Sequence, residues 1–261
     1  MPGSLKEMLN GDKVLLGGTL MEFVRPAIVK IFKQAGFDFF YIEYEHAMMD
    51  PTALAELILC AKDNDLPVVS KVPSLDRAWT TKLLDAGASA IQLPYTETRE
   101  QIDRLVEMVK YPPIGKRPGC PGLGSTGYRG DVPADDMIRQ GNDQTVIIAH
   151  IESQLGVDHI DEILDNPHVD VAFVGQYDLS ISLGVPGRFD DPKHTAAVQH
   201  VLDAARRHHK VMGMVVGDYR SAQRWIDKGV RFFETYEETA LLLHAAKALV
   251  HEFRQGLAAK R

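Results

Sequence analysis

The sequence predicts an α/β fold, a single (β/α)8 TIM barrel, on three observations. Short apolar runs rich in β-branched residues alternate with longer segments of helical period, which is typical of βαβ units and a parallel sheet. There are eight such runs. The length of 261 residues is close to the usual size of this barrel. No domain boundary is visible, so we expect residues 1–261 to form one barrel domain.

The predicted strands follow one another at regular intervals along the whole chain. They are VLLGGTL (14–20), FDFFYIE (37–43), PVVSKV (67–72), SAIQLPY (89–95), TVIIAHIE (145–152), VDVAFVG (169–175), KVMGMVVG (210–217) and VRFFETY (230–236).

The segments between these strands have the spacing of amphipathic helices. Examples are PTALAELILCAKDN, DRAWTTKLLDAG, TREQIDRLVEMVK, DPKHTAAVQHVLDAARRHH and SAQRWIDKG, several of which end at Gly or Asn. The same helix–Gly–strand sequence recurs in KQAGFDFF, LDAGASAI and IDKGVRFF. A doubly wound open sheet is the alternative, but no Gly-rich dinucleotide fingerprint follows the first strand.

Residues 111–144 interrupt this alternation with a long segment rich in glycine and proline. Such an irregular insertion in a compact domain is usually functional. We expect it to cover the ligand pocket.

The bulk composition indicates a metabolite-binding protein. With 45% hydrophobic and 25% charged residues and a net charge of −7, the chain lacks the basic excess of a general nucleic-acid binder. The N-terminal residues do not resemble a signal peptide, and no long apolar run resembles a membrane span, so a cytoplasmic location with no membrane partner is expected. The spacing of Cys60 and Cys120 indicates neither a disulfide framework nor a thiolate metal site, and Cys60 is interpreted as a small core residue.

Titratable side chains gather at the carboxyl ends of the predicted strands, where barrel enzymes build their active sites. One strand-end carboxylate alone is more often a helix cap or an ion-pair partner, and a lone histidine is more often a core residue. A lysine inside an apolar barrel strand, however, needs a partner. Their joint placement is therefore the informative observation. The residues concerned are Glu43, Glu45, His46, Lys71, His150, Glu152 and Asp178.

Glu152 and Asp178 end consecutive strands, a position from which two carboxylates can hold one hard divalent cation. Mg²⁺ or Mn²⁺ is expected, with Co²⁺ as a further option, and two protein ligands leave sites open for a bidentate substrate. A 2-oxo acid is such a substrate, because its carboxylate and keto oxygen can chelate a Lewis-acidic metal.

The segments AGFDFFYIEYEHAMMD, KLLDAGASAIQLPYTET, YPPIGKRPG, AHIES and FVGQYDLSISLG occur in the order found in the HpcH/HpaI aldolases. The chain resembles this family of metal-dependent class II pyruvate aldolases of (β/α)8 fold over nearly its whole length. The resemblance implies that Glu152 and Asp178 bind the metal. It also implies that His46 is the acid/base histidine, and that Asp85 pairs with it, often across a subunit boundary.

The resemblance further implies that the backbone at Gly175, Gln176 and Tyr177 receives the substrate carboxylate. It implies a homo-oligomer, a hexamer or trimer of dimers, in which C-terminal helices are exchanged between subunits. The terminal pattern EETALLLHAAKALVHEF is apolar enough to dock on a neighbour.

Several positions depart from the family pattern. Glu43 replaces the usual Asp, Lys71 replaces an arginine that binds the keto oxygen, and His150 replaces a Gln, where we expect it to contact substrate. A lysine lacks the planar fork of arginine, so the change at Lys71 is not conservative. We expect Glu43 to pair with Lys71, and Glu45 to be a supporting carboxylate.

The expected activity is reversible aldol cleavage of a 4-hydroxy-2-oxo acid to pyruvate, or a related 2-oxo acid, plus an aldehyde through a metal-stabilised enolate. Lys71 would neutralise the enolate, and His46 with Asp85 would move the hydroxyl proton. The alternatives are a 2-oxo acid decarboxylase, a 3-hydroxyacyl-CoA lyase, a Schiff-base enzyme using Lys71, or a 2-oxo acid binding protein without turnover. Specificity is expected in residues 111–144 and strand eight, with candidates Tyr128, Arg129, Glu234 and Tyr236.

Overall fold

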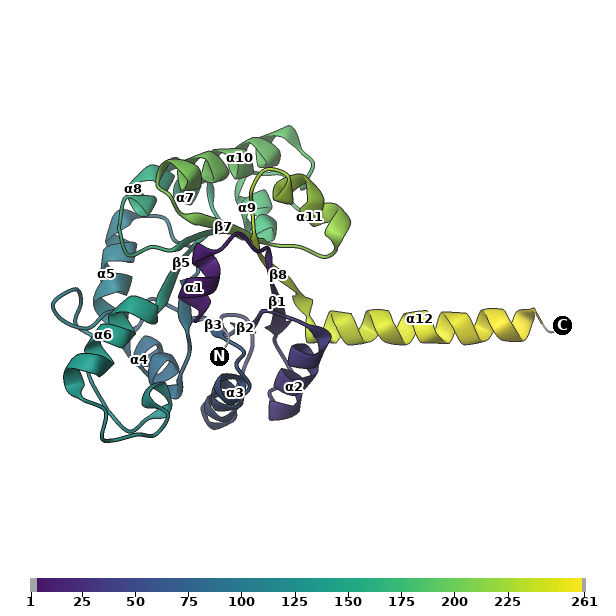
Figure 1. Cartoon of the computed structure of the whole chain (residues 1–261). Helices are drawn as coiled ribbons and strands as arrows, with labels where there is room; N and C mark the ends of the chain where they lie inside the picture. The colour runs from purple at the N-terminus through teal and green to yellow at the C-terminus, as the bar shows by residue number, and fades with distance from the viewer. Residues whose placement is uncertain (1–3, 260–261) are drawn as a thin grey trace.

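A computed structural model describes residues 4–259. Eight parallel strands close into a barrel in chain order, with the last strand paired to the first (Figure 1). The predicted TIM barrel is confirmed, and each strand lies within two residues of its expected ends. The strands are β1 (Leu15–Leu20), β2 (Phe39–Glu43), β3 (Val68–Lys71), β4 (Ala90–Leu93), β5 (Val146–Ile151), β6 (Val171–Val174), β7 (Val211–Val215) and β8 (Phe232–Glu237).

Helices surround the strands and connect their ends (Figure 1). They are α1 (Leu5–Asn10), α2 (Pro26–Ala35), α3 (Pro51–Asp63), α4 (Arg77–Ala86), α5 (Arg99–Val109), α6 (Ala134–Gln144), α7 (Gln154–Asp158), α8 (Ile160–Leu164), α9 (Gln176–Ser182), α10 (Pro192–Arg207), α11 (Tyr219–Ile226) and α12 (Glu238–Ala258), with a 3-10 turn η1 (Gly124–Thr126).

The helix ends follow from local sequence signals. Asp50 and Asp76 accept backbone N–H bonds at the starts of α3 and α4, as N-cap residues do. Gly36, Gly87 and Gly229 occupy the left-handed region with φ of 93°, 116° and 86°. Only glycine adopts this conformation without steric cost, which explains the recurring helix–Gly–strand sequence.

The barrel interior is divided into an apolar lower half and a polar upper half. In the lower half Phe39 stacks on Phe232 at 4.4 Å between ring centroids, and Phe173 meets Phe232 edge-on. Leu5 and Leu9 of α1 pack into the same cluster and close the N-terminal end of the barrel. Toward the C-terminal end of the barrel the inward-facing side chains become polar, among them Glu43, Lys71 and Gln92.

The insertion predicted at 111–144 differs from expectation in two ways. Its last third is helix α6. The segment also follows α5 and therefore starts at the N-terminal face of the barrel, where η1 packs against α4. Lys110 fixes it there, because its Nζ donates to the carbonyl oxygens of Asn142 at 2.6 Å and Thr145 at 2.7 Å. The expectation that this segment covers the ligand pocket is wrong within one chain. Helix α5 runs antiparallel to β4, so the segment that follows α5 starts at the N-terminal face of the barrel, whereas the candidate site lies at the C-terminal ends of the strands.

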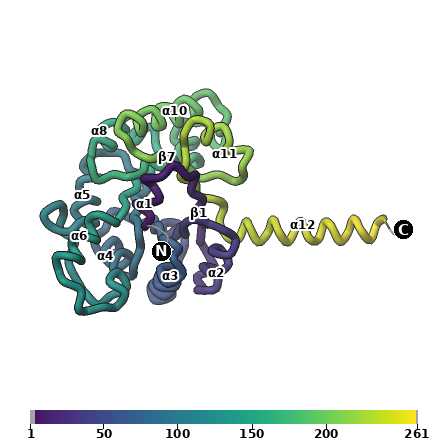
Figure 2. Tube along the Cα trace, viewed as in Figure 1, coloured from purple at the N-terminus to yellow at the C-terminus, as the bar shows by residue number. Residues whose placement is uncertain are grey.

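Helix α12 leaves the barrel and points into solvent (Figures 1 and 2). At about 1.5 Å per residue its 21 residues extend roughly 30 Å. Its contacts with β1 and β8 are confined to its base. None of the helices within residues 4–259 has the length and apolar character needed to span a membrane.

Candidate active site

The polar upper half of the barrel is organised around Lys71. This side chain, at the end of β3, is 2% exposed, and its Nζ lies 2.6 Å from Glu45, 3.3 Å from Glu43 and 3.7 Å from Glu152. Burial disfavours the ammonium, but the surrounding carboxylates outweigh it and hold the pKa of Lys71 above its usual value. The carboxylates favour the ammonium form of Lys71, which opposes the Schiff-base alternative because that reaction needs a neutral amine.

Glu43 shapes the turn that carries the other candidates. Its Oε1 accepts the backbone N–H groups of Glu45 at 3.0 Å and His46 at 3.4 Å, and its Oε2 accepts the Tyr41 hydroxyl at 3.1 Å. The predicted pairing of Glu43 with Lys71 is present. A glutamate in this position can thus bind both the lysine and the backbone of the turn that follows β2.

The structure places His46 on the rim of the site and Asp85 elsewhere in the same chain. The His46 side chain is 57% exposed, and its Nε2 lies 3.7 Å from Glu45. Asp85 lies in the last turn of α4, toward the opposite end of the barrel, and pairs with Arg117 at 2.9 Å. Within one chain the predicted His46–Asp85 pair is not formed, and Asp85 instead holds the segment after α5 against α4.

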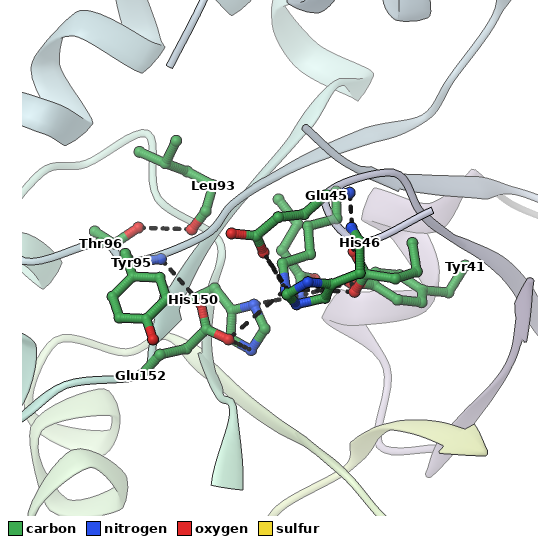
Figure 3. Close-up of polar contacts among 11 residues, drawn as sticks. Tyr41, Glu45, His46, Leu93, Tyr95, Thr96, His150 and Glu152 are labelled. Carbon is green, nitrogen blue, oxygen red and sulfur yellow. Dashed lines mark hydrogen bonds and ion pairs between the residues drawn. The ribbon is translucent and has the colours of Figure 1, made fainter. Parts of the chain in front are cut away.

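Glu152 lies beside His150 at the end of β5 (Figure 3). Its Oε2 accepts the backbone N–H of Tyr95 at 2.9 Å, and its Oε1 lies 3.4 Å from His150 Nε2. Burial raises the pKa of Glu152 to about 7, with Lys71 and the Tyr95 N–H opposing the rise and Glu45 and Asp178 adding to it. A cation bound beside Glu152 would offset both the burial of its negative charge and the repulsion from the neighbouring carboxylates.

The turn after β6 comes close to this carboxylate. A Cβ on Gly175 would lie 2.6 Å from His150 Nε2 and 2.7 Å from Glu152 Oε1, so a larger residue here would displace one of these two side chains. The first intrahelical bond of α9 runs from Leu179 N to Gly175 O. The N–H groups of Gln176 and Tyr177 precede it and are free of the helix ladder. The Gln176 side chain donates to Val215 O at 2.7 Å and is thereby tied to β7.

Three further interior residues complete the polar half of the barrel. Gln92 of β4 has its Nε2 3.1 Å from His150 Nδ1 and 3.5 Å from the Tyr41 hydroxyl. Glu234 of β8 is 1% exposed. Glu234 is one of the residues expected from the sequence to determine substrate specificity, whereas Gln92 and Tyr41 are not among the predicted site residues. The period-two alternation along SAIQLPY and FDFFYIE was the available signal, since it places both side chains on the inward face.

The residues at the ends of β5 and β6 fit a hard divalent cation. Glu152 follows β5 and Asp178 lies in the first turn of α9, which follows β6, so both supply oxygen donors; the charge of Asp178 contributes to the raised pKa of Glu152. Glu43, Glu45 and His46 form a second group whose ligand atoms lie within 4.8 Å of one another. The Lys71 ammonium lies 2.6 Å and 3.3 Å from the two carboxylates of that group and 3.7 Å from Glu152, so its positive charge opposes a bound cation more strongly at the second group.

Comparisons with known proteins agree with this arrangement. The chain is 30% identical over 254 residues to a 5-keto-4-deoxy-D-glucarate aldolase from Salmonella newport, covering 97% of this chain and 98% of the relative. An HpcH/HpaI aldolase structure from Desulfitobacterium hafniense DCB-2 superposes with a TM-score of 0.91 at 29% identity, covering 96% of both chains. The structure of the citrate synthase SbnG superposes with a TM-score of 0.86 at 27% identity, covering 97% of this chain and 98% of that one.

The sequence profile that describes the HpcH/HpaI aldolase/citrate lyase family matches residues 21–245, which include strands β2 to β8 and each candidate site residue named above. The resemblance inferred from the sequence motifs is therefore confirmed. The chain belongs to the HpcH/HpaI aldolase/citrate lyase family of enzymes.

Proposed function

We propose that this enzyme catalyses the reversible aldol cleavage of a 4-hydroxy-2-oxo acid to pyruvate, or a related 2-oxo acid, and an aldehyde. The observation that carries the proposal is the buried Lys71 ammonium set beside Glu152 at the one open end of the barrel. A fixed positive charge in a water-poor site stabilises an enolate far better than it would in water. Membership of an aldolase family supports the same reaction class.

Glu152 and Asp178 are proposed to hold a divalent cation, Mg²⁺ or Mn²⁺, with Co²⁺ as a further option. When bound there, the cation supplies Lewis-acid polarisation to a 2-oxo acid. The raised pKa of Glu152 supports this assignment, because a positive ion beside the carboxylate would offset the burial that disfavours its charged form.

The protein side chains position the substrate and move one proton. The free N–H groups of Gln176 and Tyr177, after Gly175, are proposed to bind the substrate carboxylate. Lys71 neutralises the charge that develops on the keto oxygen, and His150 faces the same space. His46, at the rim, is proposed to take the proton of the 4-hydroxyl group, because its side chain lies beside Glu45 and is open to solvent, to which the proton can pass.

A second candidate reaction uses the same enolate in the direction of condensation. The similarity to a citrate synthase supports this reading, because that name denotes carbon–carbon bond formation. Decarboxylation of a 2-oxo acid and cleavage of a 3-hydroxyacyl-CoA remain alternatives on the same site. The aldol reaction is preferred because the similarity to the 5-keto-4-deoxy-D-glucarate aldolase extends over nearly the full length of both chains.

The chain is proposed to act as a homo-oligomer, a hexamer or trimer of dimers, in which α12 docks on a second copy. Apolar side chains are exposed along α12, among them Leu249, Phe253 and Leu257. The outward face of β1 is also incompletely covered, since Leu16 is 38% exposed where a barrel strand normally packs under a helix. An apolar helix and an uncovered strand in the same molecule complement each other between copies.

Proton exchange tests the proposed chemistry without knowledge of the aldehyde. Pyruvate incubated with enzyme and Mg²⁺ or Mn²⁺ in deuterated water should lose its methyl proton signals. Glu152→Ala and Asp178→Ala should each slow this exchange at least about 100-fold, as should chelation by EDTA. Undiminished metal-dependent exchange in either variant would refute the assignment, whereas pyruvate binding without any exchange would favour a binding protein.

A further inference from the structure

The turn after β4 holds an aromatic residue in a backbone conformation that aromatic residues rarely adopt. Tyr95 has a φ of 44°, which lies in the left-handed region. For a residue with a bulky side chain this conformation is sterically unfavourable. Strain of this kind persists only where the surrounding contacts impose it, and it is concentrated at functional sites. The proposed function assigns Tyr95 no role beyond its backbone N–H group.

Three other non-glycine residues within 4–259 have a positive φ, and each of them follows a helical segment. Asp65 follows α3, Tyr128 follows η1 and His209 follows α10. Left-handed residues are common at such positions, because they close the last turn of a helix. Tyr95 instead follows a strand, at the end of the barrel where the candidate site lies. The end of a helix therefore does not account for its conformation.

Hydrogen bonds fix the turn on both sides of Tyr95. The Tyr95 N–H donates to Glu152 Oε2 at 2.9 Å, and the Thr96 N–H donates to the carbonyl oxygen of His150 at 2.9 Å. The Thr96 hydroxyl closes the turn by donating to the carbonyl oxygen of Leu93 at 2.8 Å (Figure 3). The turn is thus bonded to β5 and to its own strand, and these bonds determine the direction in which the Tyr95 side chain leaves the backbone.

The Tyr95 side chain borders the open end of the barrel. Thr96 beside it is fully buried, whereas Tyr95 is 43% exposed. Figure 3 shows the Tyr95 ring beside the Glu152 side chain. Partial burial, followed by the charges of Asp178, Glu152 and Glu45, raises the pKa of Tyr95, which is consistent with a hydroxyl on the side of the site carboxylates.

A glycine would form the same turn without strain. Glycine adopts a positive φ at no steric cost and would keep the backbone N–H that Glu152 accepts. The backbone bond to Glu152 therefore does not explain why an aromatic side chain stands here. A half-exposed ring at the edge of a pocket offers an apolar face on which the carbon chain of a ligand can pack.

We propose that Tyr95 is a specificity-determining residue whose ring packs against the aldehyde half of the substrate. The inference rests on the proposed function, which assigns the 2-oxo acid half to Glu152, Asp178 and the turn at Gly175. These groups follow β5 and β6, and Tyr95 follows β4, the strand paired with β5. The remainder of the substrate extends from the 2-oxo acid toward the open end of the barrel, which the Tyr95 ring borders.

Removing the ring while keeping the backbone conformation tests this role. Tyr95→Gly should leave the proton exchange of pyruvate within about twofold of the wild-type rate, because that reaction needs no aldehyde. In the condensation of pyruvate with butyraldehyde, the same variant should raise the KM for butyraldehyde at least about 10-fold, since the apolar contact with the ring is lost. Tyr95→Phe keeps the ring and should restore the wild-type KM.

Asp65→Gly is the matched control. It also replaces a residue of positive φ, 52°, with glycine, but between α3 and β3 at the N-terminal face, so both readouts should stay at their wild-type values. An unchanged KM for butyraldehyde in Tyr95→Gly would overturn the proposal. An equal loss of pyruvate exchange in that variant would also overturn it, because Tyr95 would then act only by supporting Glu152. A wild-type protein that catalyses neither exchange nor condensation would refute the proposed function itself, which distinguishes the two failures.

Discussion

At the scale of single residues, Lys71 decides the electrostatics of the site. One buried ammonium compensates three carboxylates that come from two other strand ends and a turn. Removing one partner of a buried ion pair is strongly destabilising because the remaining charges are left without compensation. The stability of the barrel and the chemistry of its mouth therefore depend on the same side chain.

Replacing Lys71 with Met should lower the free energy of unfolding by about 3–5 kcal/mol near pH 8. Burial already raises the folded-state pKa of Glu152 to about 7, and loss of the ammonium that opposes this rise would raise it further above its unfolded value. The folded state then binds more protons, so its stability is greatest at low pH and is lost as pH rises. Urea unfolding should show the deficit shrinking toward about pH 5.

Lys71→Arg provides the matched control, since it keeps the charge and should lose much less stability at either pH. A deficit in Lys71→Met that is the same near pH 5 and near pH 8 would show that lost packing, rather than uncompensated charge, dominates.

At the scale of elements, Lys110 joins α5 to the end of α6. Its ammonium is 2% exposed and is bonded to two backbone carbonyls at the C-terminal end of that helix. Burial lowers the pKa of Lys110 to about 8. The insertion is thus held in place by hydrogen bonds from Lys110, and burial disfavours the charged form of this side chain.

The stability of the wild-type protein relative to Lys110→Met should rise with pH above about 8. Between a folded pKa of about 8 and an unfolded pKa of 10.5, the folded state binds fewer protons than the unfolded state. The free energy of unfolding then increases by about 1.4 kcal/mol per pH unit in this window. Urea unfolding of both proteins near pH 7.5 and near pH 9.5 measures the slope, and a constant difference would contradict the assigned pKa.

At the scale of the whole molecule, α12 presents exposed apolar side chains away from the barrel. Its apolar residues lie mainly along one side, at positions 242, 246, 249, 253 and 257, while His251 is on the opposite side. Exposed apolar area of this extent on a solvent-facing helix marks an interaction surface.

The double variant Leu249→Asp/Phe253→Asp should convert the oligomer into monomers, because the charges would have to be buried against the second copy. Light scattering coupled to size-exclusion chromatography measures the mass. His251→Asp is the control on the polar side of α12 and should leave the mass unchanged. An oligomer that survives the double variant would exclude docking through this face.

The proposed oligomer offers a test of whether Asp85 takes part in the reaction. If Asp85 of one copy completes the site of His46 in another, co-expressed His46→Ala and Asp85→Asn subunits should form complete sites at about one quarter of positions. Release of pyruvate from a 4-hydroxy-2-oxo acid should then return, although each variant alone should lack it, because the 4-hydroxyl proton is the one that His46 is proposed to take.

His46→Ala mixed with Glu152→Ala is the matched control, since both residues belong to one barrel and no hybrid site is complete. Recovery in neither mixture would leave Asp85 with only its structural role, the ion pair to Arg117.

The sequence by itself determined the barrel, its eight strands and the residues at their carboxyl ends, because alternation and helix ends are local signals. It also predicted the pairing of Glu43 with Lys71, since a charge inside an apolar strand needs a partner. The placement of residues 111–144, the role of Asp85 within one chain and the Tyr41–Gln92–His150 contacts were decided by tertiary structure. Each joins segments far apart in the sequence, and the distances between them are set by barrel closure rather than by any local pattern.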